Sequence, residues 1–320
     1  MRRNGRTVLP ALVDLSTSVL IRGAAALFRR LPREASVNLA MQTARTIGPL
    51  LPRSRIGREN LRRAFPEKTD AERKEILNRM WENFARSLIE YMHVDATFDF
   101  DPKHPEAGNV TVAGAENFDR LCEGGPAIVF TAHLSNWELL GVCAAKFGLD
   151  VKSLFRAPTN RHLAKRLLQA RSKRMGPLIA SRPGAALELA ATLEAGKVVG
   201  LLVDQRFHGG VLVPFFGRLA DTNPLLAKLA RQYDCPVHGA RAVRLPGGKF
   251  RLEMTDTIEL PRDEKGDIDI EKTTARIQNI VEDWVREYPA QWMWVHRRWR
   301  HGRKTRVRSA LPGAAVTQTD

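Results

Sequence analysis

Two short, continuous apolar runs constrain the fold of this chain more than any other feature. They are Ala127–Ala132 and Val198–Val203, and helical segments separate them. A strand without interspersed polar residues is buried on both faces, as in a parallel sheet covered by helices. Each run leads directly into an ionisable residue, His133 or Asp204. The runs therefore predict parallel strands whose carboxyl ends form one edge of a site.

The remaining apolar patterns predict helices around that sheet. Thr69 and Glu72 form a capping box before a helix whose apolar residues recur at every fourth position. Segments 237–244 and 250–254 flank a Pro-Gly-Gly turn, which predicts an antiparallel hairpin. A final helix is expected to end before Pro289. The predicted fold class is α/β, with a mixed, largely parallel central sheet flanked by helices.

The two ends of the chain are predicted to lie outside the main domain. Within residues 1–31, an apolar stretch is interrupted by Asp14 and Arg22, which gather on the face opposite its leucines. This pattern favours a membrane-associated amphipathic helix, and packing of that helix on the protein's own core is an equally good interpretation. Residues 32–300 are expected to form a single domain, and residues 301–320 a basic flexible tail.

The charge of the chain restricts its partners. It has 51 Lys and Arg against 35 Asp and Glu, a net charge of +16. Nucleic acid, anionic lipid and an acidic carrier protein would all be attracted by this excess. The sequence has neither an aromatic-interleaved RNA-binding pattern nor zinc-finger ligand pairs, so anionic lipid is favoured and no nucleic-acid partner is expected.

His133 and Glu138 are the strongest candidates for catalytic residues. On one continuous helix they would lie about 140° apart, but a strand-to-helix turn allows them to converge. An imidazole beside a carboxylate is the usual arrangement for general-base catalysis, because the carboxylate fixes the tautomer and stabilises the imidazolium. A structural hydrogen-bonded pair is the alternative. The position after a buried strand favours the catalytic interpretation.

The segment from His133 to Glu138 resembles the His-x4-Glu motif of the lysophospholipid-type acyltransferases. The resemblance is strongest to the bacterial lipid A late acyltransferases, the lauroyl and myristoyl acyltransferase family, and covers most of the chain. That family usually has a glycine where Ser135 stands. Other matching segments follow in the same order: Phe155–Asn160, Arg171–Gly176, Val203–Gln205, Val213–Gly217 and Gln291–Arg298.

This resemblance implies an activity and a location. A fatty acyl chain would pass from an acyl thioester, usually acyl carrier protein with coenzyme A as the other possible donor, to a hydroxyl of a lipid A precursor. The acceptor is an anionic glycolipid. His133 would be the general base and Glu138 would orient it, in one step without an acyl-enzyme. No metal and no cofactor are implied. The protein would act at the membrane surface, on the cytoplasmic face of the bacterial inner membrane.

Arg171 and Asp204 match further site residues of the family. Arg171 continues an apolar helical stripe, where an unpaired guanidinium would be costly. Its anionic partner is Glu138 or Asp204 in a structural interpretation, and the thioester oxyanion or a substrate phosphate in a functional one. For Asp204, the structural alternative is a helix cap or a loop salt bridge.

Arg156 and Asn160 lie at a predicted loop-to-helix junction and are expected to contact the donor or the acceptor. For Asn160, a helix cap is the alternative. The later segment 292–299 mixes tryptophans with basic residues, which suits either a membrane interface or the protein core. Its His296 is expected to be packed or to face a phosphate.

Two other functions are compatible with these patterns. One is an acyltransferase acting on another bacterial glycolipid or aminolipid, because the motifs specify the chemistry more closely than the acceptor. The other is a non-catalytic protein that binds anionic membranes through its charge and amphipathic helices. The second leaves the ionisable residues at the two strand ends unexplained.

Overall fold

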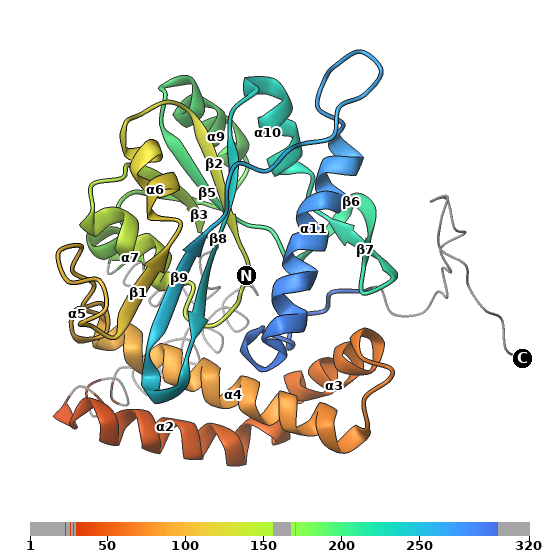
Figure 1. Cartoon of the computed structure of the whole chain (residues 1–320). Helices are drawn as coiled ribbons and strands as arrows, with labels where there is room; N and C mark the ends of the chain where they lie inside the picture. Colours follow the sequence, from red (N-terminus) through yellow and green to blue (C-terminus); the bar gives the residue numbers. More distant parts are fainter. Residues whose placement is uncertain are drawn as a thin grey trace, which may run out of the picture.

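The computed structural model describes residues 30–155 and 171–299, together with residues 23, 26, 28, 168 and 169. A seven-stranded sheet in the order β1-β9-β8-β2-β5-β3-β4 forms its centre (Figure 1). A separate antiparallel pair, β6 and β7, lies beside it. The strands are β1 Val110–Ala113, β2 Ala127–Thr131, β3 Val151–Phe155, β4 Leu178–Ala180, β5 Val198–Leu202, β6 Arg206–Phe215, β7 Arg218–Thr222, β8 Val237–Arg244 and β9 Phe250–Met254.

The two apolar runs form neighbouring parallel strands, β2 and β5. Ala127 lies opposite Val198, and Thr131 lies opposite Leu202, so the two strands end together. β8 and β9 pair in antiparallel register, as the hairpin pattern predicts. The other pairings of the main sheet are parallel. The predicted α/β class with a mixed, largely parallel sheet is confirmed.

Helices cover both faces of the sheet, which explains the uninterrupted apolar runs. Ile128 and Phe130 of β2 join the large core cluster on the side of α9, α10 and α11. Ala127 faces the other way, into a cluster with residues of α6 and α7. The helices of the main body are α5 Val94–Thr97, α6 Ala115–Cys122, α7 Glu138–Lys146, α9 Ala185–Glu194, α10 Leu225–Tyr233 and α11 Ile270–Glu287.

Three more helices form a layer along one end of the sheet (Figure 1). They are α2 Arg33–Ile47, α3 Pro52–Ala64 and α4 Asp70–Met92, and the short 3-10 helices are η1 Gly48–Leu50, η2 Pro246–Gly248 and η3 Pro289–Gln291. The predicted capping box is present at the start of α4, where Thr69 and Glu72 cap each other's backbone N–H groups.

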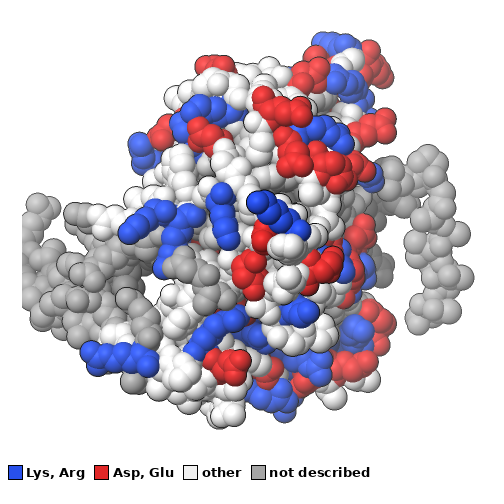
Figure 2. Space-filling model, turned by 60° about the vertical axis from the view of Figure 1, so that its left-hand side comes forward, with Lys and Arg blue, Asp and Glu red and all other residues white. Residues whose placement is uncertain are grey.

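The predicted N-terminal amphipathic helix lies almost entirely outside the described residues, and the predicted basic tail lies wholly outside them. Among the helices that the structure describes, none combines the length and the apolar character needed to cross a membrane. Figure 2 shows one face of the molecule on which lysine and arginine side chains are widely spread, with acidic side chains interspersed among them.

Candidate active site

The site lies where β2 and β5 end. The backbone N–H of Val203 donates to the carbonyl of Thr131 at 3.1 Å, which extends the pairing of the strands by one step. His133 follows β2 and Asp204 follows β5, so parallel pairing places these two residues side by side. The structure thus brings two of the predicted site residues into direct contact.

Asp204 holds both the backbone and the ring of His133. Its Oδ2 accepts the backbone N–H of His133 at 2.9 Å, and its Oδ1 lies 2.8 Å from Nδ1 of the ring. The indole N–H of Trp292 also donates to Oδ2, at 2.7 Å. Asp204 is only 2% exposed. Burial alone would raise its pKa, but His133 and these hydrogen bonds outweigh burial and hold the pKa well below the ordinary value.

The other ring nitrogen of His133 faces Gln205. Nε2 of Gln205 lies 3.0 Å from Nε2 of His133 and 3.1 Å from Nε2 of His296. An amide NH₂ group donates two hydrogen bonds, so it can serve both imidazoles when each presents an unprotonated nitrogen. With Nδ1–H directed at Asp204, Nε2 of His133 is the basic nitrogen.

Glu138 is paired with Arg171 rather than hydrogen-bonded to His133. Oε1 of Glu138 accepts from the Arg171 guanidinium, and Oε2 has no hydrogen-bond partner among the described residues. The guanidinium also lies over the ring of Phe155, 4.9 Å from its centroid. Burial raises the pKa of Glu138, while the charges of Arg171 and His133 oppose that rise. Glu138 is therefore close enough to respond to the charge of His133.

The turn between β2 and α7 is fixed by backbone contacts with the segment after η3. Ser135 donates its N–H to the carbonyl of Gln291 at 2.8 Å, and Met293 donates to the carbonyl of His133 at 3.1 Å. Ser135 has a φ of +52°, in the left-handed region that glycine adopts most readily. This turn directs the His133 side chain toward Asp204 at the sheet edge.

The late segment 292–299 belongs to the core of the protein. Of the two interpretations of its sequence, the structure therefore favours the protein core over a membrane interface. Trp292, Trp294 and Trp299 are all buried. Arg298 is also buried, and its guanidinium donates to the side chains of Thr222 and Gln278. Burial lowers the pKa of Arg298 to about 10, although the nearby carboxylates of Asp204 and Asp221 oppose the change.

The sequence pattern did not predict that two of the residues that contact His133 and Asp204 belong to the site. Gln205 contacts the basic nitrogen of His133, and Trp292 contacts the carboxylate behind it. The position of Gln205 directly after Asp204 at a strand end was the available signal. Arg156 and Asn160 lie outside the described residues, so their predicted contacts remain predictions.

A small apolar depression adjoins His133. Its volume is about 10 Å³, and its lining includes Met80, Phe84, Trp137 and Met293. A much larger cavity lies elsewhere, beside α3. Within the part of the chain that the structure describes, no group of three or more His, Cys, Asp or Glu residues is placed to hold a metal ion.

A histidine with a buried carboxylate on one ring nitrogen and a basic second nitrogen has the features that a general base requires, and here it lies at the carboxyl edge of an α/β sheet. The sequence comparison identifies the family of the chain. Residues 11–301 match the family described as bacterial lipid A biosynthesis acyltransferase, and this chain belongs to that family. The family makes it an acyltransferase with a lipid acceptor and an acyl donor. No match was found among curated proteins.

Proposed function

We propose that this protein transfers a fatty acyl group from an acyl thioester to a hydroxyl of a lipid A precursor, with His133 as the general base. The contact between His133 and Asp204 carries this proposal. Their 2.8 Å hydrogen bond leaves Nε2 of His133 free of a ring proton and directed away from the buried carboxylate. A neutral imidazole held in this tautomer can accept a proton from a hydroxyl.

The reaction then proceeds in one addition and elimination. The acceptor hydroxyl takes the place of the Gln205 amide at Nε2 of His133 and gives up its proton there. The hydroxyl oxygen attacks the thioester carbonyl carbon and forms a tetrahedral oxyanion. When the carbon–sulfur bond breaks, the thiolate takes the proton from His133, leaving an ester and a free thiol. Asp204 stabilises the imidazolium between these steps.

Glu138 and Arg171 form the second functional pair in this proposal. Arg171 is the cation best placed to stabilise the oxyanion, because its Nε has no hydrogen-bond partner among the described residues. Glu138 holds the guanidinium in position through their ion pair. The orienting role that the sequence suggested for Glu138 thus passes to Asp204, and Glu138 positions the arginine.

A direct transfer without an acyl-enzyme is supported by the state of the buried thiols. Burial raises the pKa of Cys143 to about 12 and that of Cys235 to about 11, so both are protonated at neutral pH. A protonated thiol is a poor nucleophile. Trapping of an acylated protein in the absence of acceptor would contradict a direct transfer.

The donor and the location follow from charge. Acyl carrier protein is the proposed donor, with coenzyme A thioester as the alternative, because an acidic carrier is attracted by a chain of net charge +16. The same charge supports association with the anionic surface of the inner membrane, on its cytoplasmic face.

Mass spectrometry of lipid A tests the function. Lipid A is compared between cells lacking the gene and cells in which the gene is restored as wild type or as His133→Ala. We expect one acyl chain to be lost on deletion and recovered only with the wild-type gene. An unchanged lipid A profile points to another bacterial glycolipid or aminolipid as the acceptor. Recovery by His133→Ala rejects the base assignment.

A further inference from the structure

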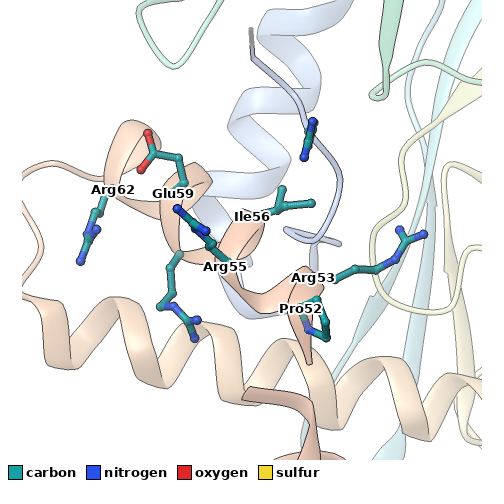
Figure 3. A pocket seen from close by; sticks show the side chains of 8 residues that line it. Pro52, Arg53, Arg55, Ile56, Glu59 and Arg62 are labelled. Atoms are coloured by element: carbon teal, nitrogen blue, oxygen red, sulfur yellow. The ribbon is translucent and has the colours of Figure 1, made fainter. Parts of the chain in front are cut away.

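A large cavity beside α3 is lined mainly by arginines. Its volume is about 680 Å³, and Arg53, Arg55, Arg58 and Arg62 of α3 line it together with Arg297. Figure 3 shows the labelled side chains projecting from this short stretch of α3 around the cavity. We call it the arginine groove. A volume of this size accommodates a small-molecule headgroup.

The positive charge of the arginine groove is poorly neutralised. Among the described residues, neither Arg53, Arg55 nor Arg297 forms an ion pair, and Arg58 contacts only the carbonyl of Pro49, at 3.3 Å. Arg62 is paired with Asp70 at 3.8 Å, so four of the five lining arginines have no ion-pair partner. All four are exposed. The single acidic residue of the lining, Glu59, is already paired with Arg63 at 2.8 Å. Guanidinium groups in this state are suited to bind phosphate by paired N–H donors.

The groove is held against the chain segment that adjoins the catalytic site. The amide of Asn60, on α3, donates to the carbonyls of Trp294 and His296, the first of them at 2.7 Å. His296 contacts Gln205, which contacts His133. One short run of chain therefore connects the groove to the site. Arg297 lines the groove, and His296, the residue before it, is linked through Gln205 to the basic nitrogen of His133.

Exposed apolar residues lie immediately before the arginines. Ile47 is 50% exposed, Leu50 is 79% exposed and Leu51 is 39% exposed. They occupy the end of α2, the end of η1 and the position just before α3, so they shortly precede Arg53. Apolar side chains next to arginines suit the boundary between acyl chains and phosphate headgroups of a membrane. A soluble protein partner would not require this apolar edge.

We propose that the arginine groove binds the phosphate of the acceptor glycolipid's headgroup, and so fixes the acceptor with its hydroxyl toward His133. This rests on the proposed function, because it assigns a site to the acceptor of that reaction. The concave shape, the headgroup-sized volume and the apolar edge favour a lipid headgroup over the acidic surface of a carrier protein.

The decisive experiment measures binding without turnover. Full-length protein carrying His133→Ala is sedimented with phosphatidylcholine vesicles containing a lipid A precursor, either phosphorylated or treated with phosphatase. We expect roughly tenfold tighter binding to the phosphorylated form, the effect of one or two charge-assisted hydrogen bonds. Adding Arg55→Ala and Arg58→Ala should abolish this preference. Arg55→Lys with Arg58→Lys should restore part of it.

The matched control removes the same charge elsewhere. Arg120 on α6 and Arg276 on α11 are also exposed. Their double alanine variant should keep the full preference for the phosphorylated lipid. A preference that survives in the Arg55 and Arg58 double variant, or is equally lost in the control, overturns the assignment of the groove.

Kinetics on the otherwise wild-type chain separates the acceptor from the donor. In the Arg55→Ala, Arg58→Ala variant we expect the KM for the phosphorylated acceptor to rise roughly tenfold, with the KM for the acyl donor unchanged. A rise in the KM for acyl carrier protein alone would assign the groove to the donor and overturn the proposal. Binding is measured without turnover, so failure of the acyl-transfer proposal would not be mistaken for failure of the groove.

Discussion

Oδ1 of Asp204 lies 2.8 Å from Nδ1 of His133, although the two residues are 71 positions apart in the chain. They meet because each follows one of two neighbouring parallel strands that end at the same level. The carboxylate is buried and also holds the indole N–H of Trp292. This fixed carboxylate determines which nitrogen of His133 is available as a base.

Replacing Asp204 by Asn tests that relationship. The amide cannot stabilise an imidazolium and can present its NH₂ group to Nδ1, which would favour the wrong tautomer of His133. We expect kcat to fall by at least about 100-fold with a small change in KM. Steady-state kinetics with a lipid acceptor and an acyl thioester measures both constants.

The matched control for this variant is Asp99→Asn. Asp99 also accepts backbone hydrogen bonds, from Asn109 and Val110, but on a different loop. Its replacement should leave kcat nearly unchanged. If Asp204→Asn keeps wild-type kcat while Glu138→Gln loses it, Glu138 is the carboxylate that serves His133.

The lowered pKa of Asp204 predicts a pH dependence of stability. Its pKa lies below the ordinary value of 3.8 in the folded chain, so the unfolded chain binds a proton first as the pH falls. Its stabilising contribution is therefore fully present above the unfolded pKa and declines as the pH falls toward the folded pKa.

Urea unfolding of wild type and Asp204→Asn checks this sign. The difference between their free energies of unfolding should shrink as the pH falls below about 4. A difference that grows below pH 4 would contradict the assigned shift. Asp99→Asn, measured in the same buffers, controls for the loss of a hydrogen-bonded side chain elsewhere in the chain.

Replacing Arg171 by Lys separates the effect of its charge from the effect of its planar geometry in the pair with Glu138. Lysine keeps the positive charge but loses the planar fork that contacts Glu138 and stacks on Phe155. We expect kcat/KM to fall roughly tenfold, the loss of one charge-assisted hydrogen bond in the transition state. The free energy of unfolding should change by less than about 1 kcal/mol, because lysine keeps the positive charge that pairs with Glu138.

Arg174→Lys is the control on the same helical segment, residues 171–175. Arg174 lies over the ring of Tyr91 and donates to its carbonyl at 3.0 Å. Its replacement should cost little activity. Equal losses in the two variants would indicate a general effect on this helix rather than a specific role of Arg171.

The sequence predicted the parts of the site that follow from burial. Continuous apolar runs predict neighbouring buried strands, and parallel strands present their carboxyl ends together, so His133 and Asp204 were expected at one edge. For the carboxylate that orients the imidazole, the sequence pattern and the family resemblance indicated Glu138. Glu138 is near in sequence, but it starts α7 and pairs with Arg171, while strand register brings Asp204 to Nδ1.

The role of Trp292 was hidden for a different reason. A segment that mixes tryptophans with basic residues has the same composition at a membrane interface and in a core with buried arginines. Only the three-dimensional pairing of Trp292 with Leu134 places its indole N–H against Asp204. Long-range pairing of this kind leaves no local pattern.

Gln205→Glu tests whether Nε2 of His133 is the base. A carboxylate in place of the amide, 3.0 Å from Nε2, would stabilise the imidazolium. The acidic limb of the pH profile of kcat/KM should therefore move to higher pH, by about one unit. His296→Gln is the control, because His296 is the other imidazole that Gln205 contacts. Gln278→Glu is less suitable as a control, because Gln278 is buried. An unmoved acidic limb in Gln205→Glu would reject His133 as the titrating base.

Ser135→Gly tests the strain in the turn that follows His133. Ser135 has a φ of +52°, and its hydroxyl is buried without a hydrogen-bond partner among the described residues. The left-handed conformation costs a non-glycine residue about 1–2 kcal/mol, while the added flexibility of glycine costs about 0.5–1 kcal/mol. We expect Ser135→Gly to raise the free energy of unfolding by about 0.5–1 kcal/mol in urea unfolding, with wild-type kcat. Ser135→Ala removes the hydroxyl but keeps the unfavourable φ, so glycine should be the more stable variant. An alanine variant as stable as the glycine variant would place the cost in the hydroxyl and not in the backbone.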